Sequence, residues 1–400
     1  MVAQASKMTL LLLAVLCFLV AMGKTFDAAE STPLVRLVQI TDTHIGESCN
    51  GDLSYEGCKP VRALTDAVAK VNELSPQPTA VLVTGDITSS ALMPEFEKAN
   101  EILSALKAPW FPVIGNHDSW PYTRAADNTF TQTDTPVGDE YFAKTFGERL
   151  TEGVKGSAEG GVSVRAWPTA TCKNGNFGFQ TWHHNFIVEF KALPNLKVLG
   201  LDWTARGAAL PEPGVGPEAE LHDYPCGTLP WLGDQLKGFA KAPEANSTRF
   251  FIAQHHPFHN RDVFSPFGRN LIKNFTFDNV QSAKVQQVFE DSFPSDSILG
   301  VIAGHMHRWF YGDAWTRFTA LDSKWMKVPE WETSACKGWE IDSDFVSAFT
   351  IWDFTPSTDG SQAPIMSHVD YLWKSPKGKW MGKLEDDWKN LVKSFFQKKK

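Results

Sequence analysis

Side chains that can bind metal ions follow five short apolar segments of this sequence. In chain order, the segments and their polar ends are VRLVQI before Asp42 and His44, TAVLV before Asp86, WFPVI before Asn116, His117 and Asp118, RFFIA before His255 and His256, and ILGVIA before His305 and His307. In the first and the last set two candidate ligands stand two positions apart, so an extended backbone would turn both toward the same face. Seven of the 11 histidines lie in or beside these ends, at positions 44, 117, 255, 256, 259, 305 and 307. We therefore expect the five ends to form one site.

The residue types at these ends indicate a metal centre. Carboxylate, imidazole and one amide group, without a thiolate, suit Zn, Fe, Mn or Co. There are more candidate ligands than one tetrahedral ion needs, and two ions about 3.5–4 Å apart that share a carboxylate would account for the number. Such a pair activates water and holds the attacking and leaving oxygens of a displacement at phosphorus. Taken singly, Asp42 could cap a loop, Asp86 could form an Asx-turn and each histidine could be structural, but turn chemistry gives no reason for histidine at four segment ends.

Six apolar segments are predicted to be strands. They are Val35–Ile40, Thr79–Val83, Trp110–Ile114, Leu196–Leu201, Arg249–Ala253 and Ile298–Ala303. Helical spacing of apolar residues predicts helices at Pro60–Leu74 and Pro94–Leu106, between the first three strands. This alternation is typical of βαβ units and predicts an α/β fold with a largely parallel inner sheet. The metal-binding residues then follow the carboxyl ends of the strands, where ligands bind in open α/β sheets.

Two regions interrupt this alternation. Residues 119–181 are polar, with Gly and Pro, and are predicted to be an insertion with little core of its own. Residues 205–230 are predicted to be a long surface loop, and loops of that length are often lids or binding loops. The last segment, 374–400, places Trp, Leu and Phe near one helical face and ends in three lysines, which favours a docked amphipathic helix over one on a membrane surface. The main domain is expected at 34–355, with a C-terminal extension at 356–400.

The N-terminus has the features of a signal peptide. A lysine precedes an apolar run from Met8 to Gly23, which is short for a membrane span of about 20 apolar residues. We expect residues 1–23 to be removed and the chain to be secreted, or kept in the lumen of the secretory pathway; the alternative is an uncleaved signal anchor. No other stretch could span a bilayer. Sequons at Asn246 and Asn274 would be glycosylated if the chain enters that route.

The cysteines are consistent with an oxidising compartment. Cys49 and Cys58 enclose the loop CNGDLSYEGC and are the first candidates for a disulfide. Cys172 and Cys226 are the next candidates, which would leave Cys336 over. No C-x-x-C pattern is present, so a structural zinc knuckle is not expected.

The order of the motifs resembles the calcineurin-like metallophosphoesterase family. The pattern D-x-H, G-D, G-N-H-D, H-x-P, G-H-x-H is met by TDTH, TGDIT, IGNHD, QHHPF and AGHMH, spread over about residues 35–309. The stretches LGLDW and LPWLGDQLKG are similar to the family's middle strand and the helical segment beside it. The resemblance implies a four-layer αββα sandwich with the metal ligands at the carboxyl ends of its strands.

The resemblance also implies a role for each candidate residue. One metal would be bound by Asp42, His44 and His307, and the other by Asn116, His255 and His305, with Asp86 as the bridge. His117 would protonate the leaving oxygen or stabilise the transition-state charge, and Asp118 would orient it. The ligand of H-x-P is its first histidine, which selects His255 and leads us to expect that His256 faces away as a structural residue.

Some positions are expected to shape the site, and others depart from the family pattern. Gly115 is expected to let the chain turn so that the next two residues point at the metal and the substrate, while His259 and Trp120 are expected to line the cleft. Many relatives have a second Asp where this chain has Ser89. The stretch GDITSSA lacks the Arg of the protein Ser/Thr phosphatases and the Tyr of the purple acid phosphatases, which also lack the counterpart of His44.

The implied function is that of an exported binuclear phosphoesterase. It would hydrolyse a small phosphodiester, or a monoester, by attack of a hydroxide that bridges two divalent or trivalent metal ions. The D-x-H pattern and the stretch GNHDSWP favour phosphodiesterases, including secreted sphingomyelinase-like enzymes. Alternatives are an acid-type monoester phosphatase and a metal-binding protein without turnover, although all seven ligand positions are filled. A nuclease is disfavoured by the net charge of −8, and the substrate, metal and oligomeric state stay open.

Overall fold

The computed structural model describes the chain in segments. They are residues 33–119, 122–124, 130–132, 137–151, 161–166, 172–173, 180–205, 219–258, 277, 279–307, 310–313, 328–333, 335–337, 339–341, 344–357, 364–375 and 379–383. The chain divides into two compact units, Met1–Pro33 and Leu34–Lys400, and the elements below belong to the second. Outside the described residues fall the expected signal peptide, both cleft-lining candidates and one sequon: residues 1–23, Trp120, His259 and Asn274.

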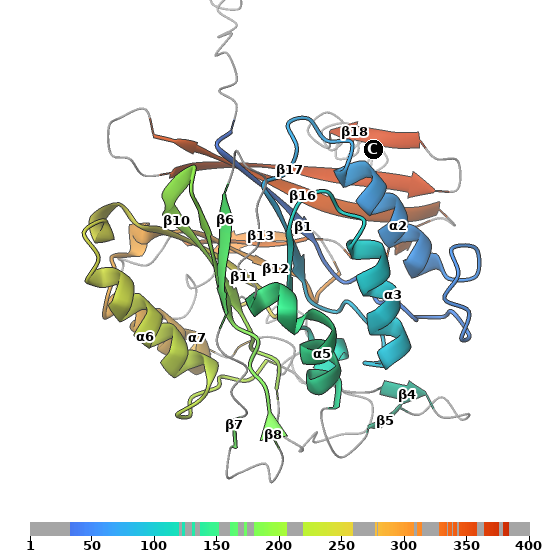
Figure 1. Ribbon diagram of the computed structural model, residues 1–400, viewed down its shortest axis with the longest axis horizontal. Helices are drawn as coiled ribbons and strands as arrows, with labels where there is room; N and C mark the ends of the chain where they lie inside the picture. Colours follow the sequence, from blue (N-terminus) through green and yellow to red (C-terminus); the bar gives the residue numbers. More distant parts are fainter. Residues whose placement is uncertain are drawn as a thin grey trace, which may run out of the picture. The chain divides into compact units, whose positions relative to one another are not determined.

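The first sheet combines the first three predicted strands with the C-terminal part of the chain (Figure 1). Its order is β18-β17-β16-β1-β2-β3, and β15 also pairs with β16. The strands are β1 (Val35–Ile40), β2 (Ala80–Thr84), β3 (Trp110–Val113), β15 (Trp339–Ile341), β16 (Asp344–Pro356), β17 (Pro364–Ser375) and β18 (Lys379–Lys383). Strands β1, β2 and β3 are parallel, and β16 runs antiparallel to β1. The segments after β1, β2 and β3 therefore leave the sheet at the same edge.

The second sheet contains the other three predicted strands, which form its parallel centre. Its order is β13-β14-β12-β11-β10-β9-β6. The strands are β6 (Val162–Ala166), β9 (Phe186–Phe190), β10 (Leu193–Leu201), β11 (Arg249–Gln254), β12 (Ile298–Ala303), β13 (Phe310–Asp313) and β14 (Pro329–Glu332). Strands β10, β11, β12 and β14 are parallel, while β13, β9 and β6 are antiparallel to their neighbours.

The two sheets pack face to face between two pairs of helices (Figure 1). Helices α2 (Lys59–Val71) and α3 (Met93–Leu103) cover the first sheet, and α6 (Thr228–Ala240) and α7 (Asn279–Glu290) cover the second. Successive residues of β11 show this layering, because neighbouring side chains of a strand point to opposite faces of the sheet. Phe250 packs with the residues of α6 and α7, whereas the ring of Phe251 lies 5.3 Å from that of Trp352 on β16. The layers confirm the expected α/β fold and its αββα order.

Helix α2 shows why the local pattern predicted the helices well. Its apolar residues Val61, Leu64, Val68 and Val71 are buried, and they recur every three or four positions as one helical face requires. A proline stands in its first turn, where the missing N–H has no helical partner to lose. The predicted span, Pro60–Leu74, differs from the observed helix by a few residues at the ends.

The described part of the region at 119–181 packs against the main domain. Helix α5 (Val137–Thr151) buries Phe142 and Phe146, whose rings lie 6.3 and 5.9 Å from that of Phe96 on α3. Strand β6 joins the second sheet at its edge. The remaining short elements are α4 (Asn116–Ser119), β4 (Tyr122–Arg124), β5 (Phe130–Gln132), β7 (Cys172–Lys173), β8 (Gln180–Thr181), η1 (Ala245–Ser247) and η3 (Ser295–Ser297).

The predicted C-terminal helix is wrong at residues 374–375 and 379–383. Residues 374–375 end β17 and residues 379–383 form β18, so this part of the expected extension completes the first sheet. Strand β17 pairs with β16 along twelve residues, and these non-local hydrogen bonds outweigh the helical spacing of the apolar residues. Residues 384–400, which include the lysine tail, lie outside the described residues.

The disulfide between Cys49 and Cys58 is confirmed, with Cα atoms 4.7 Å apart. Cys226 is also disulfide-bonded, and Cys336 is buried.

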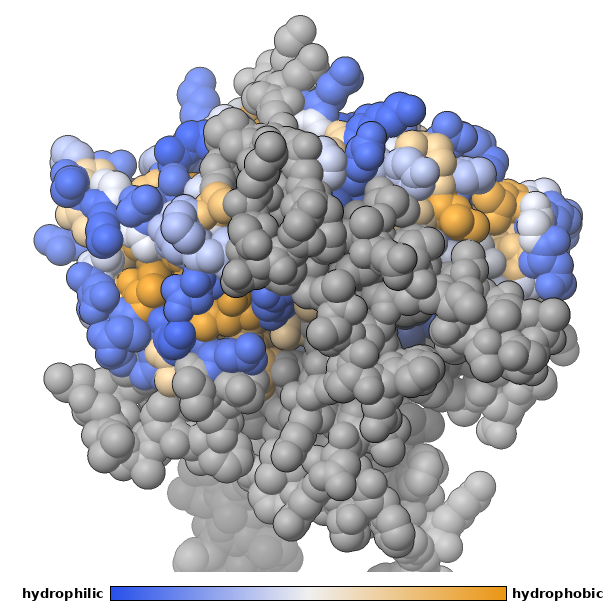
Figure 2. Space-filling view, turned by 90° about the horizontal axis from the view of Figure 1, so that it is seen from below, coloured by the Kyte–Doolittle hydropathy of each residue, from blue (hydrophilic) through white to orange (hydrophobic). Residues whose placement is uncertain are grey.

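Charged and polar side chains cover most of the described surface in the view of Figure 2, with smaller hydrophobic areas between them. The large hydrophobic side chains that are exposed come from separate parts of the chain: Leu34, Tyr55, Leu92 and Ile365. None of the helices in the described segments is both long enough and apolar enough to cross a membrane.

Candidate metal centre

The ends of strands from both sheets meet at one place. The first sheet contributes Asp42, His44, Asp86 and Asn116, and the second contributes His255, His305 and His307. Two groups of ligand atoms result, one from Asp42, His44, Asp86 and His307, and the other from His255, His256 and His305. Within each group the ligand atoms all lie within 4.8 Å of one another.

The first group offers two carboxylates and two imidazoles. Its imidazole nitrogens face each other, with Nε2 of His44 and Nε2 of His307 3.0 Å apart. Nε2 of His307 lies 3.2 Å from Oδ1 of Asp42, and Nε2 of His44 lies 3.5 Å from Oδ2 of Asp86. These donors are the types and the number that a divalent ion needs, so the residues fit a metal.

The second group is built around His255. Its Nδ1 donates a hydrogen bond of 2.9 Å to the carbonyl of Thr84, which leaves Nε2 as the nitrogen able to bind a metal. That Nε2 lies 3.1 Å from Oδ1 of Asn116 and 3.2 Å from Oδ1 of Asp86. The two oxygens of Asp86 therefore face different groups, Oδ2 toward His44 and Oδ1 toward His255.

The charges in the centre shift the pKa values of its residues strongly. Burial raises the pKa of Asp86, but the charges of the surrounding histidines, His255 first, outweigh it and hold this pKa well below its ordinary value. Burial lowers the pKa of His255, but the charges of Asp86 and Asp42 outweigh it and raise this pKa to about 9. Burial lowers the pKa of His305 to about 3. A bound metal ion would compensate the negative charge of the carboxylates, and His255 would then not need its second proton.

Several candidate ligands have a strained backbone. Positive φ angles occur at Asp42 (51°), His44 (45°), Asp86 (49°), His305 (68°) and His307 (51°). Such conformations cost roughly 1–3 kcal/mol each and persist only where the surroundings enforce them. Here hydrogen bonds between the strand ends do so: the amide of His44 donates to the carbonyl of Asp86 (2.9 Å), and the amide of His305 to Oδ1 of Asp42 (3.0 Å).

Two glycines leave room for the carboxylates. A Cβ atom at Gly115 would lie 2.2 Å from the backbone nitrogen of Asp86, and one at Gly304 would lie 2.5 Å from Oδ2 of Asp42. The chain turns after Gly115 as expected, since the amide of Asp118 donates to the carbonyl of Gly115 (3.1 Å) and α4 begins at the next residue. Gly115 is not among the glycines with a positive φ, so the need for glycine here comes from the close approach of Asp86.

His117 lies at the start of α4, beside the first group. Its ring centroid is 4.7 Å from that of His44, and its amide donates to Oδ1 of Asp86 (2.9 Å). Nδ1 of His117 donates a hydrogen bond of 2.7 Å to the carbonyl of Ser89, so Nε2 is the nitrogen that can exchange a proton. The main chain of Ser89 thus orients this imidazole.

Asp118 joins the two segments that follow β2 and β3. Its carboxylate accepts hydrogen bonds from the amides of Gly115 (2.9 Å), Ile87 (3.1 Å) and Thr88 (2.7 Å), and from the hydroxyl of Thr88 (2.9 Å). These bonds join the segment after β2 to the segment after β3. Asp118 thus holds the backbone on both sides of the site, while the carbonyl of Ser89 accepts the hydrogen bond of the His117 imidazole.

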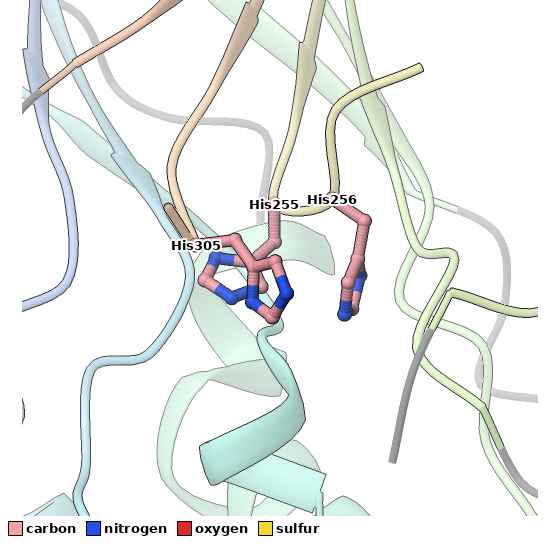
Figure 3. A group of neighbouring side chains, drawn as sticks. All are labelled: His255, His256 and His305. Atoms are coloured by element: carbon pink, nitrogen blue, oxygen red, sulfur yellow. The ribbon is translucent and has the colours of Figure 1, made fainter. Parts of the chain in front are cut away.

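His256 does not face away, contrary to expectation. Its side chain is fully buried, and its ring lies 4.9 Å from that of His255 and 4.6 Å from that of His305 (Figure 3). The expectation assumed an extended backbone, but the chain bends directly after β11. Neighbouring side chains therefore need not alternate.

Sequence analysis did not identify Lys337. Its amide donates to the carbonyl of Asp42 (3.3 Å), and its ammonium group is paired with Glu47. Burial is the largest cause that lowers the pKa of His44, and the charge of Lys337 is the second. No local motif marks this lysine, because it reaches the centre from a loop far along the chain.

Residues 35–309 match the sequence profile of the family described as calcineurin-like phosphoesterase. The match covers more than half of the chain, so the chain belongs to this family, as the motifs had indicated.

Curated relatives match a shorter part of the chain. The chain is 35% identical over 83 residues to a probable glycerophosphodiester phosphodiesterase GpdQ of Arcobacter nitrofigilis, which covers 21% of this chain and 30% of that protein. It is 34% identical over 84 residues to a probable cyclic nucleotide phosphodiesterase of Rhodopseudomonas palustris, covering 21% of this chain and 30% of the relative. The match thus spans under a third of each relative.

Solved structures are similar only at a distance. A purple acid phosphatase from yellow lupin (Lupinus luteus) seeds has a TM-score of 0.43 and 11% identity, over 87% of this chain and 53% of that one. The phosphopantetheinyl hydrolase of Mycobacterium tuberculosis has a TM-score of 0.36 and 13% identity, over 75% of this chain and 90% of that one. Similarity at this level carries no functional information.

Proposed function

We propose that this chain is an exported, binuclear metal-dependent phosphodiesterase. The observation that carries the proposal is the position of Asp86, whose two oxygens face two separate groups of donors, one with His44 and one with His255. A carboxylate in this position can bridge two ions. Asp42, His44 and His307 would hold one ion, and Asn116, His255 and His305 the other.

Divalent ions bound there would activate water and withdraw charge from the phosphoryl oxygens. The residues of the chain supply the rest of the chemistry. In its doubly protonated form His117 would give the Nε2 proton to the leaving oxygen, while its Nδ1–H stays bonded to the carbonyl of Ser89. Substrate would approach from the side on which His117, His305 and His307 are partly exposed, since Asp42 and Asp86 are fully buried behind them.

Two observations support a diester as the substrate. The relatives that match the chain are named as phosphodiesterases, although only about 30% of their length is matched. The D-x-H pattern is also complete, with His44 in the first group. The residues that would select among diesters are expected in 119–181 and 205–230, which are described only in part.

Export is supported by the N-terminal sequence and by the cysteines. The disulfide between Cys49 and Cys58 is of a kind that persists in an oxidising compartment. The sequon at Asn246 lies on η1, where its residue is exposed and accessible to glycosylation. Detection of the glycosylated chain in the medium of a secreting host would test this part of the proposal, and retention in the cytosol would contradict it.

The activity can be tested with bis-p-nitrophenyl phosphate beside p-nitrophenyl phosphate, followed by a glycerophosphodiester, a cyclic nucleotide and sphingomyelin. Asp86→Asn should lose both activity and bound metal. His117→Ala should keep its metal and lose about 10²–10⁴-fold in rate. Matched controls are Asp223→Asn, at a surface ion pair, and His368→Ala, at an exposed position of β17; both should stay active.

The outcomes separate the alternatives. Diester cleavage that is lost in Asp86→Asn and kept in Asp223→Asn would support the proposal. A clear preference for the monoester would replace it with an acid-type phosphatase. A protein that binds two metals and turns over none of these substrates would contradict the proposed activity.

A further inference from the structure

Three imidazoles, and not two, gather at the second group of donors; those of His255 and His256 are buried and that of His305 is partly exposed (Figure 3). The ring centroids of His255, His256 and His305 lie 4.9, 4.6 and 5.0 Å apart in pairs, so they form a nearly regular triangle. The rings are inclined to one another at 84°, 51° and 73°, and each offers a nitrogen within 4.8 Å of the others. His255 and His256 come from the end of β11, and His305 comes from the end of β12.

These separations are compatible with three imidazoles that share one ion. A bond of about 2.0–2.1 Å from zinc to nitrogen places each ring centroid about 3.2 Å from the metal, so that rings at 90–109° lie about 4.5–5.2 Å apart. All three pairs fall within this range. The first group supports the comparison, since His44 and His307 have centroids 4.9 Å apart and Nε2 atoms 3.0 Å apart.

The chain fixes the position of His256 independently of any metal. Its carbonyl accepts a hydrogen bond of 2.8 Å from the side-chain amide of Gln254, whose oxygen accepts one of 3.1 Å from the indole of Trp203. Two residues further on, the amide of Phe258 donates to Glu330 (2.7 Å). The bend that brings His256 beside His305 is therefore held on both sides.

We propose that His256 is a further ligand of the second metal, together with Asn116, His255, His305 and the shared Asp86. This inference rests on the proposed binuclear function. The second site then has three imidazoles, an amide oxygen and a share of one carboxylate, whereas the first has two imidazoles, Asp42 and the same share. Imidazole favours zinc and similar ions over manganese. The two sites therefore differ in metal preference, and the second one selects zinc.

The test measures zinc binding directly, on the metal-free full chain. Zn²⁺ and Mn²⁺ are titrated against a chelator into the wild type, His256→Ala and His256→Gln. His255→Ala is the control for loss of the second site, and His368→Ala is the control for removal of an imidazole elsewhere. The expected result is two Zn²⁺ per wild-type chain, with the tighter Zn²⁺ site weakened more than about 100-fold in both His256 variants and a much smaller change for Mn²⁺.

A second measurement separates a ligand from a residue that only positions one. With one equivalent of Zn²⁺, X-ray absorption should count three imidazoles in the wild type and two in His256→Gln. Unfolding of the metal-free proteins shows whether a variant has lost its fold, and His256→Gln is chosen because it keeps most of the volume. Equal imidazole counts, or zinc affinities equal to those of His368→Ala, would overturn the role of His256 and leave the proposed function intact. Fewer than two Zn²⁺ per wild-type chain would refute the binuclear function itself.

Discussion

Adding one methyl group at Gly115 is expected to disable the metal centre while leaving the protein folded. A Cβ atom at this position would lie 2.2 Å from the backbone nitrogen of Asp86 and 2.3 Å from its Oδ1. Because Cβ atoms essentially never approach other atoms within 3.0 Å, the two segments must separate by at least 0.8 Å (3.0 − 2.2). The atoms that must move are backbone and a carboxylate held on both oxygens, so no flexible side chain can absorb the shift.

The size of the effect follows from this displacement. A misplacement of about 1 Å in a catalytic group can cost roughly 100-fold in rate. Overpacking a filled site costs about 1–3 kcal/mol of stability. We therefore expect Gly115→Ala to lose at least about 100-fold in diester hydrolysis and to bind less metal, with a free energy of unfolding lower by only about 1–3 kcal/mol.

Gly238→Ala on α6 is the matched control, because a Cβ atom there meets nothing within 4 Å. Alanine is the better helix former, so this variant should be slightly more stable, by roughly 0.5–1 kcal/mol, and fully active. The assays are hydrolysis of bis-p-nitrophenyl phosphate, elemental analysis of bound metal and unfolding in urea. A Gly115→Ala protein with two bound metals and a rate within threefold of the wild type would refute the reasoning from close approach.

Three further predictions concern stability. Asp118→Asn turns an amide group toward the backbone donors of two loops, so we expect a loss of about 2–4 kcal/mol in urea unfolding, and an unchanged midpoint would contradict this role. Burial raises the pKa of Glu95 to about 7, so its contribution to stability is complete below its ordinary pKa of 4.5 and is lost as the pH rises to about 7. Between pH 4 and pH 8 the wild type should therefore lose up to about 3 kcal/mol more than Glu95→Gln, while Glu97→Gln, exposed on the same helix, should follow the wild type; equal pH profiles for all three would disprove this. Removal of metal by a chelator should abolish activity and lower the thermal midpoint, and added Zn²⁺ or Mn²⁺ should restore both; a midpoint that ignores metal would speak against binding at this buried centre.

The strands that carry the site could be predicted because they are short apolar runs that end in polar residues. Strand β12 was predicted with its observed bounds, and β11 differs by one residue. The convergence of their ends follows from parallel pairing, which places all carboxyl ends at one edge of a sheet. The two separate groups of donors required the structure, since they depend on how one sheet faces the other.

Local pattern failed where distant contacts decide the structure. Helix α5 buries Phe142 and Phe146, four residues apart, but glycines at positions 138 and 147 and polar neighbours concealed this face. Trp380 on β18 belongs to a longer spacing of apolar residues that suits a helix, yet pairing with β17 makes this segment a strand. The position of His256 depends on a bend that distant residues hold, Gln254 with Trp203 on one side and Glu330 on the other.

The metal centre also has a consequence for how the protein matures. Its residues lie far apart in the chain, as the bond between Asp42 and His305 across 263 positions illustrates. An ion bound there would cross-link the two sheets. Because its ligands are far apart in the sequence, it would close long loops of the chain. Long-range contacts of this kind form late in folding. The site would therefore exist only after both sheets have packed together. Metal uptake would then be the last step of folding, and the bound metal would stabilise the packing of the two sheets.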